Sequence, residues 1–192
     1  MPRLFTGLEI PADIADELQL MQGGVWGARW IEAESYHITL RFMGDISDGI
    51  ARELVEALDD VDMPSFTIRL KGVGSFGGAK PRAIWAGVDD DESGSLKRLQ
   101  TWHERLCQVV GLKPEPRKFT PHVTLARLRD SGVEGVQSFV AAHSLFESRP
   151  FEVRQFVLYS SRPSRGGGPY VSEEIYPLKD YSEEYYALSD LR

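Results

Sequence analysis

One four-residue pattern occurs twice in this chain, and it constrains the fold more than any other feature. The first copy is His37-Ile38-Thr39-Leu40 and the second is His122-Val123-Thr124-Leu125, with the two histidines 85 residues apart. Side chains of a β-strand alternate between its two faces. Each histidine therefore shares a face with its threonine, opposite two apolar residues. The pattern predicts two strands, each anchored in a core on one face and presenting an imidazole and a hydroxyl on the other.

Strands and helices alternate in the apolar spacing of the whole chain. Strands are expected over residues 4–10, 30–43, 66–73, 83–88, 119–128, 151–160 and 170–178, and helices over 12–21, 48–59, 93–110 and 133–143. The two histidine strands hold comparable places, each followed by a helix. We therefore predict an α+β fold built from a bilobed duplicated unit, with two antiparallel sheets facing a central groove and helices packed outside. Residues 1–192 are expected to form a single bilobed domain.

The composition indicates an ordinary globular protein, with 42% hydrophobic and 27% charged residues. No apolar run reaches the roughly 20 residues that cross a bilayer, and the N-terminus has no leader-like segment. Cys107 is the only cysteine, which excludes an intramolecular disulfide and a cysteine-based metal cluster. The formal net charge of −7 argues against broad binding to duplex nucleic acid, but it permits a local basic site for one phosphate. A monomeric cytoplasmic protein that binds no membrane is expected.

Two imidazoles that face each other suit acid–base chemistry on a phosphate ester. One can take a proton from water while the other gives a proton to the leaving oxygen, because both protonation states of histidine exist near neutral pH. The threonine hydroxyls can donate hydrogen bonds to the non-bridging oxygens, and an arginine can stabilise the developing charge. This arrangement needs neither a metal nor another cofactor.

The other two histidines lack a neighbouring threonine of this kind. His103 falls inside the helix predicted over residues 93–110, and His143 falls near the end of the helix predicted over 133–143. A position on a helix surface is expected for the first and at a helix end for the second.

Two arginines and several strand aromatics can be interpreted either as RNA-binding residues or as structural ones. Arg162 and Arg165 flank a glycine run and either guide an RNA strand or keep a loop soluble; solubility is favoured. Aromatic residues of the strands either stack on a base or fill the core, and the core is favoured. These aromatic residues are Phe5, Phe42 and Tyr170.

The doubled pattern resembles the 2H phosphoesterase superfamily, and more closely its bacterial and archaeal RNA 2′,3′-cyclic phosphodiesterases, also called 2′-5′ RNA ligases. The resemblance covers nearly the whole chain, including residues 3–11, 81–85, 121–127, 156–161 and 168–170. It implies an active site in a groove between two lobes. It also implies metal-independent opening of a 2′,3′-cyclic phosphate, on RNA ends or nucleotides, to a 2′-phosphomonoester. Ligation would be the reverse reaction at the same site.

The resemblance also implies a role for each residue of the pattern. His37 would be the proton donor to the leaving 3′ oxygen, and His122 the proton acceptor from water. Thr39, Thr124 and Arg127 would bind the phosphate. The sequence alone does not fix the order of the two histidines, because the two copies are nearly symmetric.

The assignment of the arginine conflicts with strand alternation. Arg127 is five positions after His122 and should point away from the groove in a regular strand, whereas Arg41 is four positions after His37 and should point into it. A twist or a bulge at the strand end would bring Arg127 round. We expect Arg127 to contact the phosphate, with Arg41 as the second choice.

Three alternatives remain open. One is a phosphodiesterase for another cyclic phosphate, such as an ADP-ribose cyclic phosphate. Another is a non-catalytic module that binds RNA ends, although both intact His-x-Thr pairs argue against it. The last is a metal hydrolase with His37 and His122 as ligands, although the sequence shows no cluster with metal-site spacing.

Overall fold

The computed structural model describes residues 3–90, 93–161 and 170–179 of the chain. Strands and helices alternate along it, which confirms the predicted α+β class. The elements are β1 (Arg3–Glu9), α1 (Ala12–Leu20), β2 (Ala28–Trp30), the 3-10 turn η1 (Ala33–Ser35), β3 (His37–Asp45), α2 (Asp48–Leu58), β4 (Phe66–Phe76), β5 (Ala83–Asp90), α3 (Ser95–Val109), β6 (His122–Leu128), α4 (Val133–Ala142), β7 (Phe151–Val153), β8 (Gln155–Ser161) and β9 (Tyr170–Pro177).

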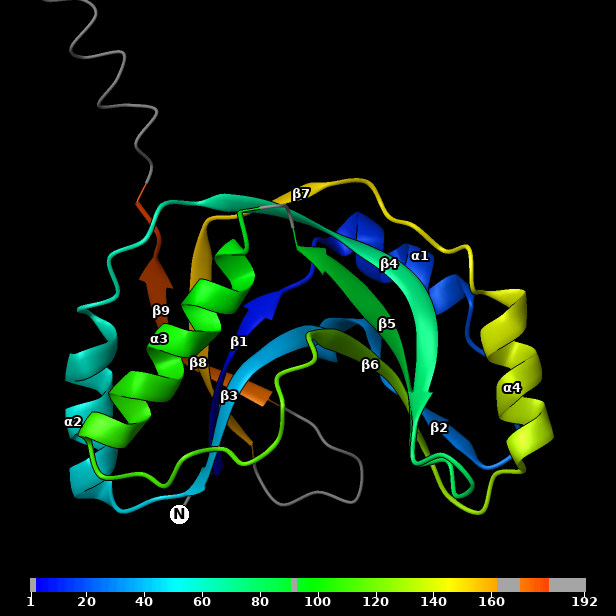
Figure 1. Ribbon diagram of the computed structural model, residues 1–192, viewed down its shortest axis with the longest axis horizontal. Coiled ribbons are helices and arrows are strands. Elements are labelled where there is room, and N and C mark those ends of the chain that lie inside the picture. The colour runs from blue at the N-terminus through cyan, green and yellow to red at the C-terminus, as the bar shows by residue number, and fades with distance from the viewer. Residues whose placement is uncertain (1–2, 91–92, 162–169, 180–192) are drawn as a thin grey trace, which may run out of the picture.

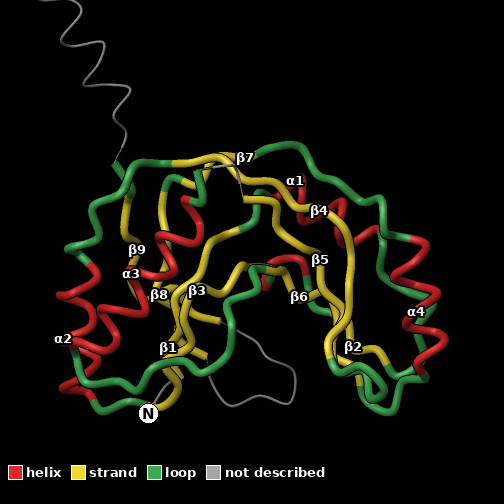
Figure 2. Tube along the Cα trace, viewed as in Figure 1, coloured by secondary structure: helices red, strands yellow, loops and turns green. Residues whose placement is uncertain are grey.

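All strands belong to one curled sheet (Figures 1 and 2). The strand order is β7-β4-β5-β6-β3-β1-β8-β9, with β2 added on β6, and neighbouring strands run antiparallel. The two predicted sheets are therefore the two halves of one sheet. Their joint is the pair of histidine strands, β3 and β6, which meet at the single register pair Ile38–Val123. Curling lets the halves diverge on either side of this joint.

The two halves of the sheet correspond strand by strand on either side of the joint. Moving outward, β3 is followed by β1 and β8 in one half, and β6 is followed by β5 and β4 in the other. This arrangement is the duplicated unit that the repeated pattern predicts. The segment predicted as one strand over residues 151–160 differs, because it splits at Arg154 into β7, which pairs with β4, and β8, which pairs with β1. The chain thus crosses from one half to the other over the top of the molecule in Figure 1.

Helices cover each half on the outside, as predicted. α1 and α4 lie with the half that contains β4, β5 and β6, and α2 and α3 lie with the other half (Figure 1). Local sequence sets their ends: for example, Ser47 caps α2 by accepting a hydrogen bond from the Ile50 backbone N–H at 3.3 Å. Among the described residues, no helix has the length and apolar character needed to cross a bilayer. The single domain over residues 1–192, the cytoplasmic location and the monomeric state stay predictions.

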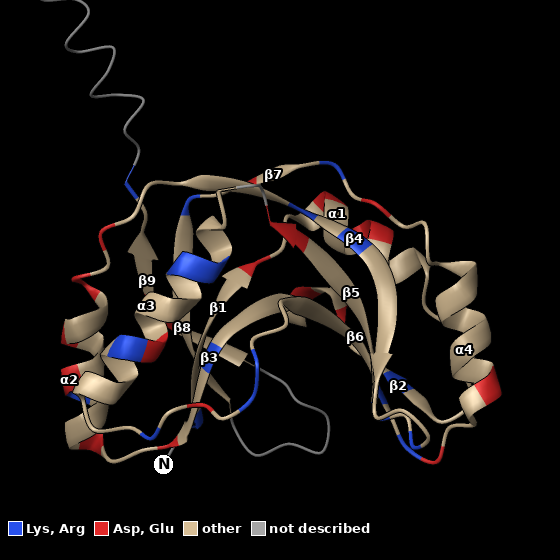
Figure 3. Ribbon diagram, in the orientation of Figure 1, with Lys and Arg blue, Asp and Glu red and all other residues tan. Residues whose placement is uncertain are grey.

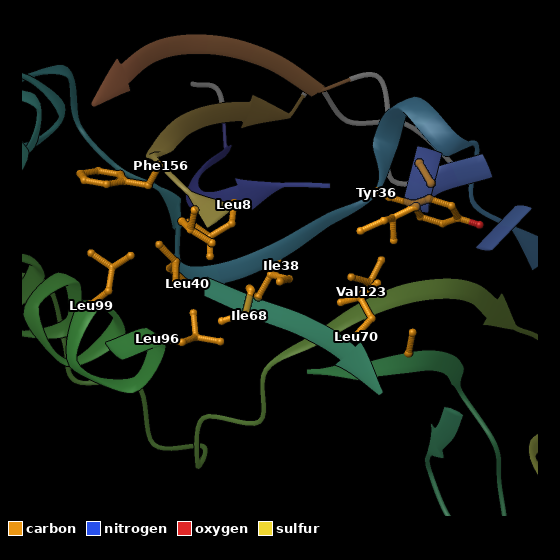
Figure 4. Close-up of a cluster of buried hydrophobic side chains, with 14 of the residues drawn as sticks. Leu8, Tyr36, Ile38, Leu40, Ile68, Leu70, Leu96, Leu99, Val123 and Phe156 are labelled. Carbon is orange, nitrogen blue, oxygen red and sulfur yellow. The ribbon is translucent and has the colours of Figure 1, made fainter. Parts of the chain in front are cut away.

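The apolar residues of the repeated pattern lie in the main core. Ile38, Val123 and Leu125 are completely buried, and Leu40 is nearly so. Figure 4 shows Ile38, Leu40 and Val123 among side chains from β1, β4, α3 and β8. Burial of such side chains is the main favourable term in folding, at about 1.5–3 kcal/mol each. Core packing therefore fixes which way the opposite, polar face of each histidine strand points.

The buried position of His103 differs from the predicted helix surface. Its side chain is completely buried on α3 and packs edge-on against Phe156, with ring centroids 4.5 Å apart. Its Nδ1 lies 2.8 Å from the Leu99 carbonyl oxygen, and burial lowers the pKa of His103 to about 4. A neutral imidazole fits this core position as a flat, largely apolar ring. His143 directly follows α4, as expected.

Candidate active site

The strand register brings the two His-x-Thr pairs face to face. Ile38 is opposite Val123 in the antiparallel pair, so His37 lies across from Thr124, and Thr39 lies across from His122. Each imidazole therefore faces the hydroxyl of the other copy. The charge of His122 acts on the titration of His37, which is consistent with this short separation. The structure thus brings together the four polar residues that the sequence singled out.

A backbone carbonyl orients each imidazole in the same way. His37 Nδ1 lies 2.8 Å from the Ser35 carbonyl oxygen, and His122 Nδ1 lies 2.7 Å from the Thr120 carbonyl oxygen. A carbonyl can only accept, so Nδ1 carries the proton in both rings. Each Nε2 is then the nitrogen that can take up or release a proton. These two carbonyls, both two residues before the histidine, were not predicted, because backbone acceptors leave no signal in a sequence.

Aromatic side chains from other strands of the sheet pack against each imidazole. Phe5 of β1 and Tyr159 of β8 lie 4.9 Å and 6.0 Å from His37, centroid to centroid, and Tyr170 packs edge-on at 5.0 Å. On the other side, two aromatic residues surround His122. They are Phe76 of β4, edge-on at 4.9 Å, and Trp85 of β5, at 6.3 Å. Phe5 is 3% exposed, which agrees with its predicted place in the core.

These apolar walls lower the pKa of both histidines. Burial is the main cause for His37, and the nearby charges of His122 and Arg127 add to it, so that its pKa falls to about 4. Burial also lowers the pKa of His122. The hydrogen bond from each Nδ1 to its carbonyl opposes this effect. Both rings are therefore mainly neutral at pH 7 in the free protein.

A β-bulge resolves the conflict over Arg127. The pairing of β5 with β6 slips between Ile84 and Trp85, so Leu125 has no partner residue on β5. Leu125 and Ala126 are both buried, which reverses the alternation after Thr124. Arg127 therefore returns to the side of the histidine and lines the groove with Thr124. Of the two possibilities, a twist or a bulge, the structure shows a bulge.

Arg41 is one of the residues that line the groove, but carboxylates of the protein engage its charge. A matching slip in the pairing of β1 with β3 makes Leu40 the extra residue, so Leu40 and Arg41 are both buried. Arg41 is 6% exposed, and its guanidinium forms ion pairs with Glu104 of α3 and Glu115. It also donates a hydrogen bond of 2.7 Å to the Lys113 carbonyl oxygen. Arg41 thus ties β3 to α3 and to residues 110–121, the connector between α3 and β6.

The polar face opens into one groove with a volume of about 670 Å³. Three polar residues of the joint, Thr39, His122 and Thr124, line it, whereas His37 is not one of the lining residues. The other described lining residues are Leu40, Arg41, Phe42, Phe76, Gln100, Glu115, Arg117, Lys118, Phe119, Thr120 and Arg127. Such a volume exceeds what a single phosphate group needs and fits a nucleotide-sized ligand. Arg162 and Arg165 lie outside the described residues.

No group of three or more histidine, cysteine, aspartate or glutamate side chains is placed to hold a metal ion within the described parts of the chain. The two histidines of the joint face threonine hydroxyls and aromatic rings. The arrangement can therefore bind an anion through hydroxyls and a guanidinium, and it can move protons at two nitrogens.

A protein-family model described as LigT like Phosphoesterase matches residues 8–85 and 87–170. The matched ranges contain both His-x-Thr pairs and cover most of the chain. The chain belongs to the LigT-like phosphoesterase family. This membership confirms the predicted relationship to the 2H phosphoesterases.

Curated relatives of this phosphoesterase are named RNA 2′,3′-cyclic phosphodiesterase. The relative from Aeropyrum pernix is 41% identical over 100 residues, which is 52% of this chain and 56% of the relative. The relative from Aquifex aeolicus is 32% identical over 153 residues, which is 77% of this chain and 81% of the relative. The matched stretch thus spans little more than half of the first relative and most of the second.

The fold of the phosphoesterase is also found among solved structures. The structure titled E. coli LigT complexed with 3′-AMP has a TM-score of 0.75 and 24% sequence identity, and the match covers 93% of this chain and 99% of that one. The likeness supports the curled α+β architecture.

Alanine substitutions of Arg127 and Arg41 should distinguish a role in activity from a role in stability. Arg127→Ala should lower kcat/KM on a cyclic phosphate by about 10²-fold or more, because a charge-assisted contact to the phosphate is lost. Its unfolding midpoint in urea should change little, since Arg127 is exposed. Arg41→Ala should instead lower the free energy of unfolding by about 1.5–3 kcal/mol, because the partly buried carboxylate of Glu104 loses its ion pair and the Lys113 carbonyl oxygen loses a charged donor.

Arg41→Lys is the matched control for charge in this experiment, since lysine keeps the charge but cannot make all the contacts of the guanidinium. An Arg127→Ala protein with full activity, beside a folded but inactive Arg41→Ala protein, would reverse the assignment.

Proposed function

We propose that the protein hydrolyses 2′,3′-cyclic phosphates at the ends of RNA or on nucleotides and leaves a 2′-phosphomonoester. The observation that carries this proposal is the pairing of the two His-x-Thr units across the Ile38–Val123 joint, with both Nε2 atoms available and both Nδ1 atoms held by carbonyls. Relatives named RNA 2′,3′-cyclic phosphodiesterase support the choice of substrate. The 3′-AMP complex of E. coli LigT supports a nucleotide at this groove.

In this proposal the phosphate lies between the two imidazoles. Thr39 and Thr124 donate hydrogen bonds to its non-bridging oxygens, and Arg127 neutralises part of its charge. His122 takes a proton from water as the water oxygen attacks phosphorus. His37 gives a proton to the 3′ oxygen as the P–O3′ bond breaks. The attacking and leaving oxygens then lie on opposite sides of phosphorus, as the facing histidines require.

Arg127 gives the two histidines different environments. It lies close enough to His37 to lower the pKa of that imidazole, and no such effect acts on His122. In the free protein this charge favours a neutral His37, whereas a general acid must carry a proton. A bound phosphate anion would offset the positive charge of Arg127 and allow His37 to take up the proton that it later donates. The assignment of His37 as the donor and His122 as the acceptor thus follows the resemblance to the family, and it requires this effect of the bound phosphate.

The same site can run the reaction with an alcohol in place of water. If a 5′-hydroxyl of a second RNA end attacks the cyclic phosphate, the product is a 2′-5′ phosphodiester. Ligation is therefore part of the proposed function as the reverse of cleaving such a linkage, and no additional catalytic group is required.

Product identification tests the proposed function. An oligonucleotide with a 2′,3′-cyclic phosphate end should be converted to the 2′-phosphate, and EDTA should not lower the rate, because the proposed steps use only side chains. The isomers can be separated by chromatography against synthetic 2′- and 3′-phosphate standards. A 3′-phosphate product, or a rate abolished by EDTA, contradicts the mechanism. Tight binding of the cyclic end without turnover identifies a non-catalytic end-binding module instead.

The pH dependence follows from the lowered pKa values of both histidines. The free enzyme is active when one imidazole is protonated and the other neutral, so kcat/KM should peak below pH 6.5 and fall as the pH rises above it. The value of kcat should peak at higher pH, because the bound phosphate anion raises the pKa of the imidazoles. Initial rates across pH 4–9 measure both profiles. A kcat/KM that still rises above pH 7 contradicts the proposal.

A further inference from the structure

The groove continues beyond His122, away from Arg127. The antiparallel register places the end of β3 beside the start of β6, so Phe42 lies at the same end as His122 and the connector. Phe42, Lys118 and Phe119 all line this part of the groove. The same register runs the end of β6, with Arg127, toward the start of β3, which is the opposite end of the joint.

Phe42 and Arg127 occupy equivalent positions in the two copies. Each is the fifth residue after its histidine, and each follows a bulge that leaves two successive residues buried. The duplicated fold therefore puts a guanidinium at one end of the groove and a phenyl ring at the other. Phe42 is 42% exposed, which is unusual for a large apolar side chain of a central strand. An exposed aromatic face beside a phosphate position is suited to stacking on a nucleobase.

The connector adds positive charge to the Phe42 end. Lys118 is exposed and makes no ion pair with any residue that the structure describes. Arg117 is paired with Glu115, which also contacts Arg41. Figure 3 shows basic residues with acidic colour between them on the connector, and acidic residues on α2. In a protein with a formal net charge of −7, an unpaired lysine at the groove is a local attraction for a phosphate.

We propose that the groove between Phe42 and Lys118 binds the nucleotide that carries the attacking hydroxyl, namely the first nucleotide of an RNA with a 5′-hydroxyl end. Its base stacks on the Phe42 ring, and its 3′-phosphate meets the ammonium group of Lys118. This inference rests on the proposed function, in which His122 accepts the proton of the nucleophile. The nucleophile must then approach from the His122 end, where this groove lies.

The step balances without any further reactant. His122 Nε2 takes the proton of the 5′-hydroxyl as the P–O5′ bond forms, and His37 gives a proton to O3′ as the P–O3′ bond breaks. The products are a 2′-5′ phosphodiester and a free 3′-hydroxyl. With an empty Phe42–Lys118 groove, water takes the same place and hydrolysis results.

The experiment measures the partition between ligation and hydrolysis. The full chain is incubated with an oligonucleotide that ends in a 2′,3′-cyclic phosphate and with increasing amounts of a 5′-hydroxyl dinucleotide. Both products arise from one bound donor, so their ratio reports acceptor binding and does not depend on a general loss of activity. The ratio should fall about tenfold in Phe42→Leu, since the base of the acceptor loses its stacking partner. Phe42→Leu keeps an apolar side chain, which protects the fold.

Lysine variants of the connector provide the matched comparison. Lys118→Ala should also lower the ratio and should weaken its dependence on salt, because one phosphate contact is lost. Lys113→Ala should leave the ratio as in the wild type, since that exposed side chain does not line the groove. An unchanged ratio in both Phe42→Leu and Lys118→Ala overturns the inference. The inference is also overturned if the wild-type protein hydrolyses the donor oligonucleotide while the dinucleotide is neither ligated to it nor slows its hydrolysis. The proposed hydrolysis of cyclic phosphates would then be supported without the acceptor site. A protein that does not turn over the donor at all contradicts both.

Discussion

One backbone pairing, between Ile38 and Val123, sets the relative position of every group in the candidate site. The apolar side chains on one face of this joint are completely buried, which fixes the direction of the opposite face. Each imidazole is then set across from the hydroxyl of the other copy, and a carbonyl two residues earlier holds its Nδ1. The site is thus built mainly from strand geometry, with loops contributing only to its rim.

Symmetry alone would give two equivalent histidines, so the differences between the copies decide the chemistry. Equivalent bulges turn the fifth residue after each histidine into the groove, where one copy has Arg127 and the other Phe42. The residue before it is buried in both copies, as Arg41 in one and Ala126 in the other. Arg41 uses this position to hold the connector that leads to His122, through Glu115 and the Lys113 carbonyl. We infer that the end of the groove with His37 and Arg127 serves the phosphate and the leaving oxygen, and that the end with His122 and Phe42 serves the nucleophile.

Local patterns in the sequence were enough to predict the α+β class, the two histidine strands and the four facing residues, because alternation in a strand is a local property. The single continuous sheet could not be predicted, since strand pairing depends on contacts between distant segments. The burial of Arg41 shows a second limit. One extra residue in a strand reverses all later alternation, and nothing in Leu40-Arg41-Phe42 marks the bulge. The buried His103 shows a third limit of prediction from the sequence. Its place in a helix does not reveal which side of the helix is packed against the sheet.

The most direct test of the two-histidine account compares two leaving groups in two variants. On a 2′,3′-cyclic phosphate, His37→Ala and His122→Ala should each lose about 10²–10⁴-fold in kcat. On a nitrophenyl phosphodiester, whose leaving group needs no proton, His37→Ala should recover most of its activity, whereas His122→Ala should stay impaired. Recovery in His122→Ala instead would exchange the two roles, and wild-type turnover of the cyclic phosphate by either variant would contradict the account.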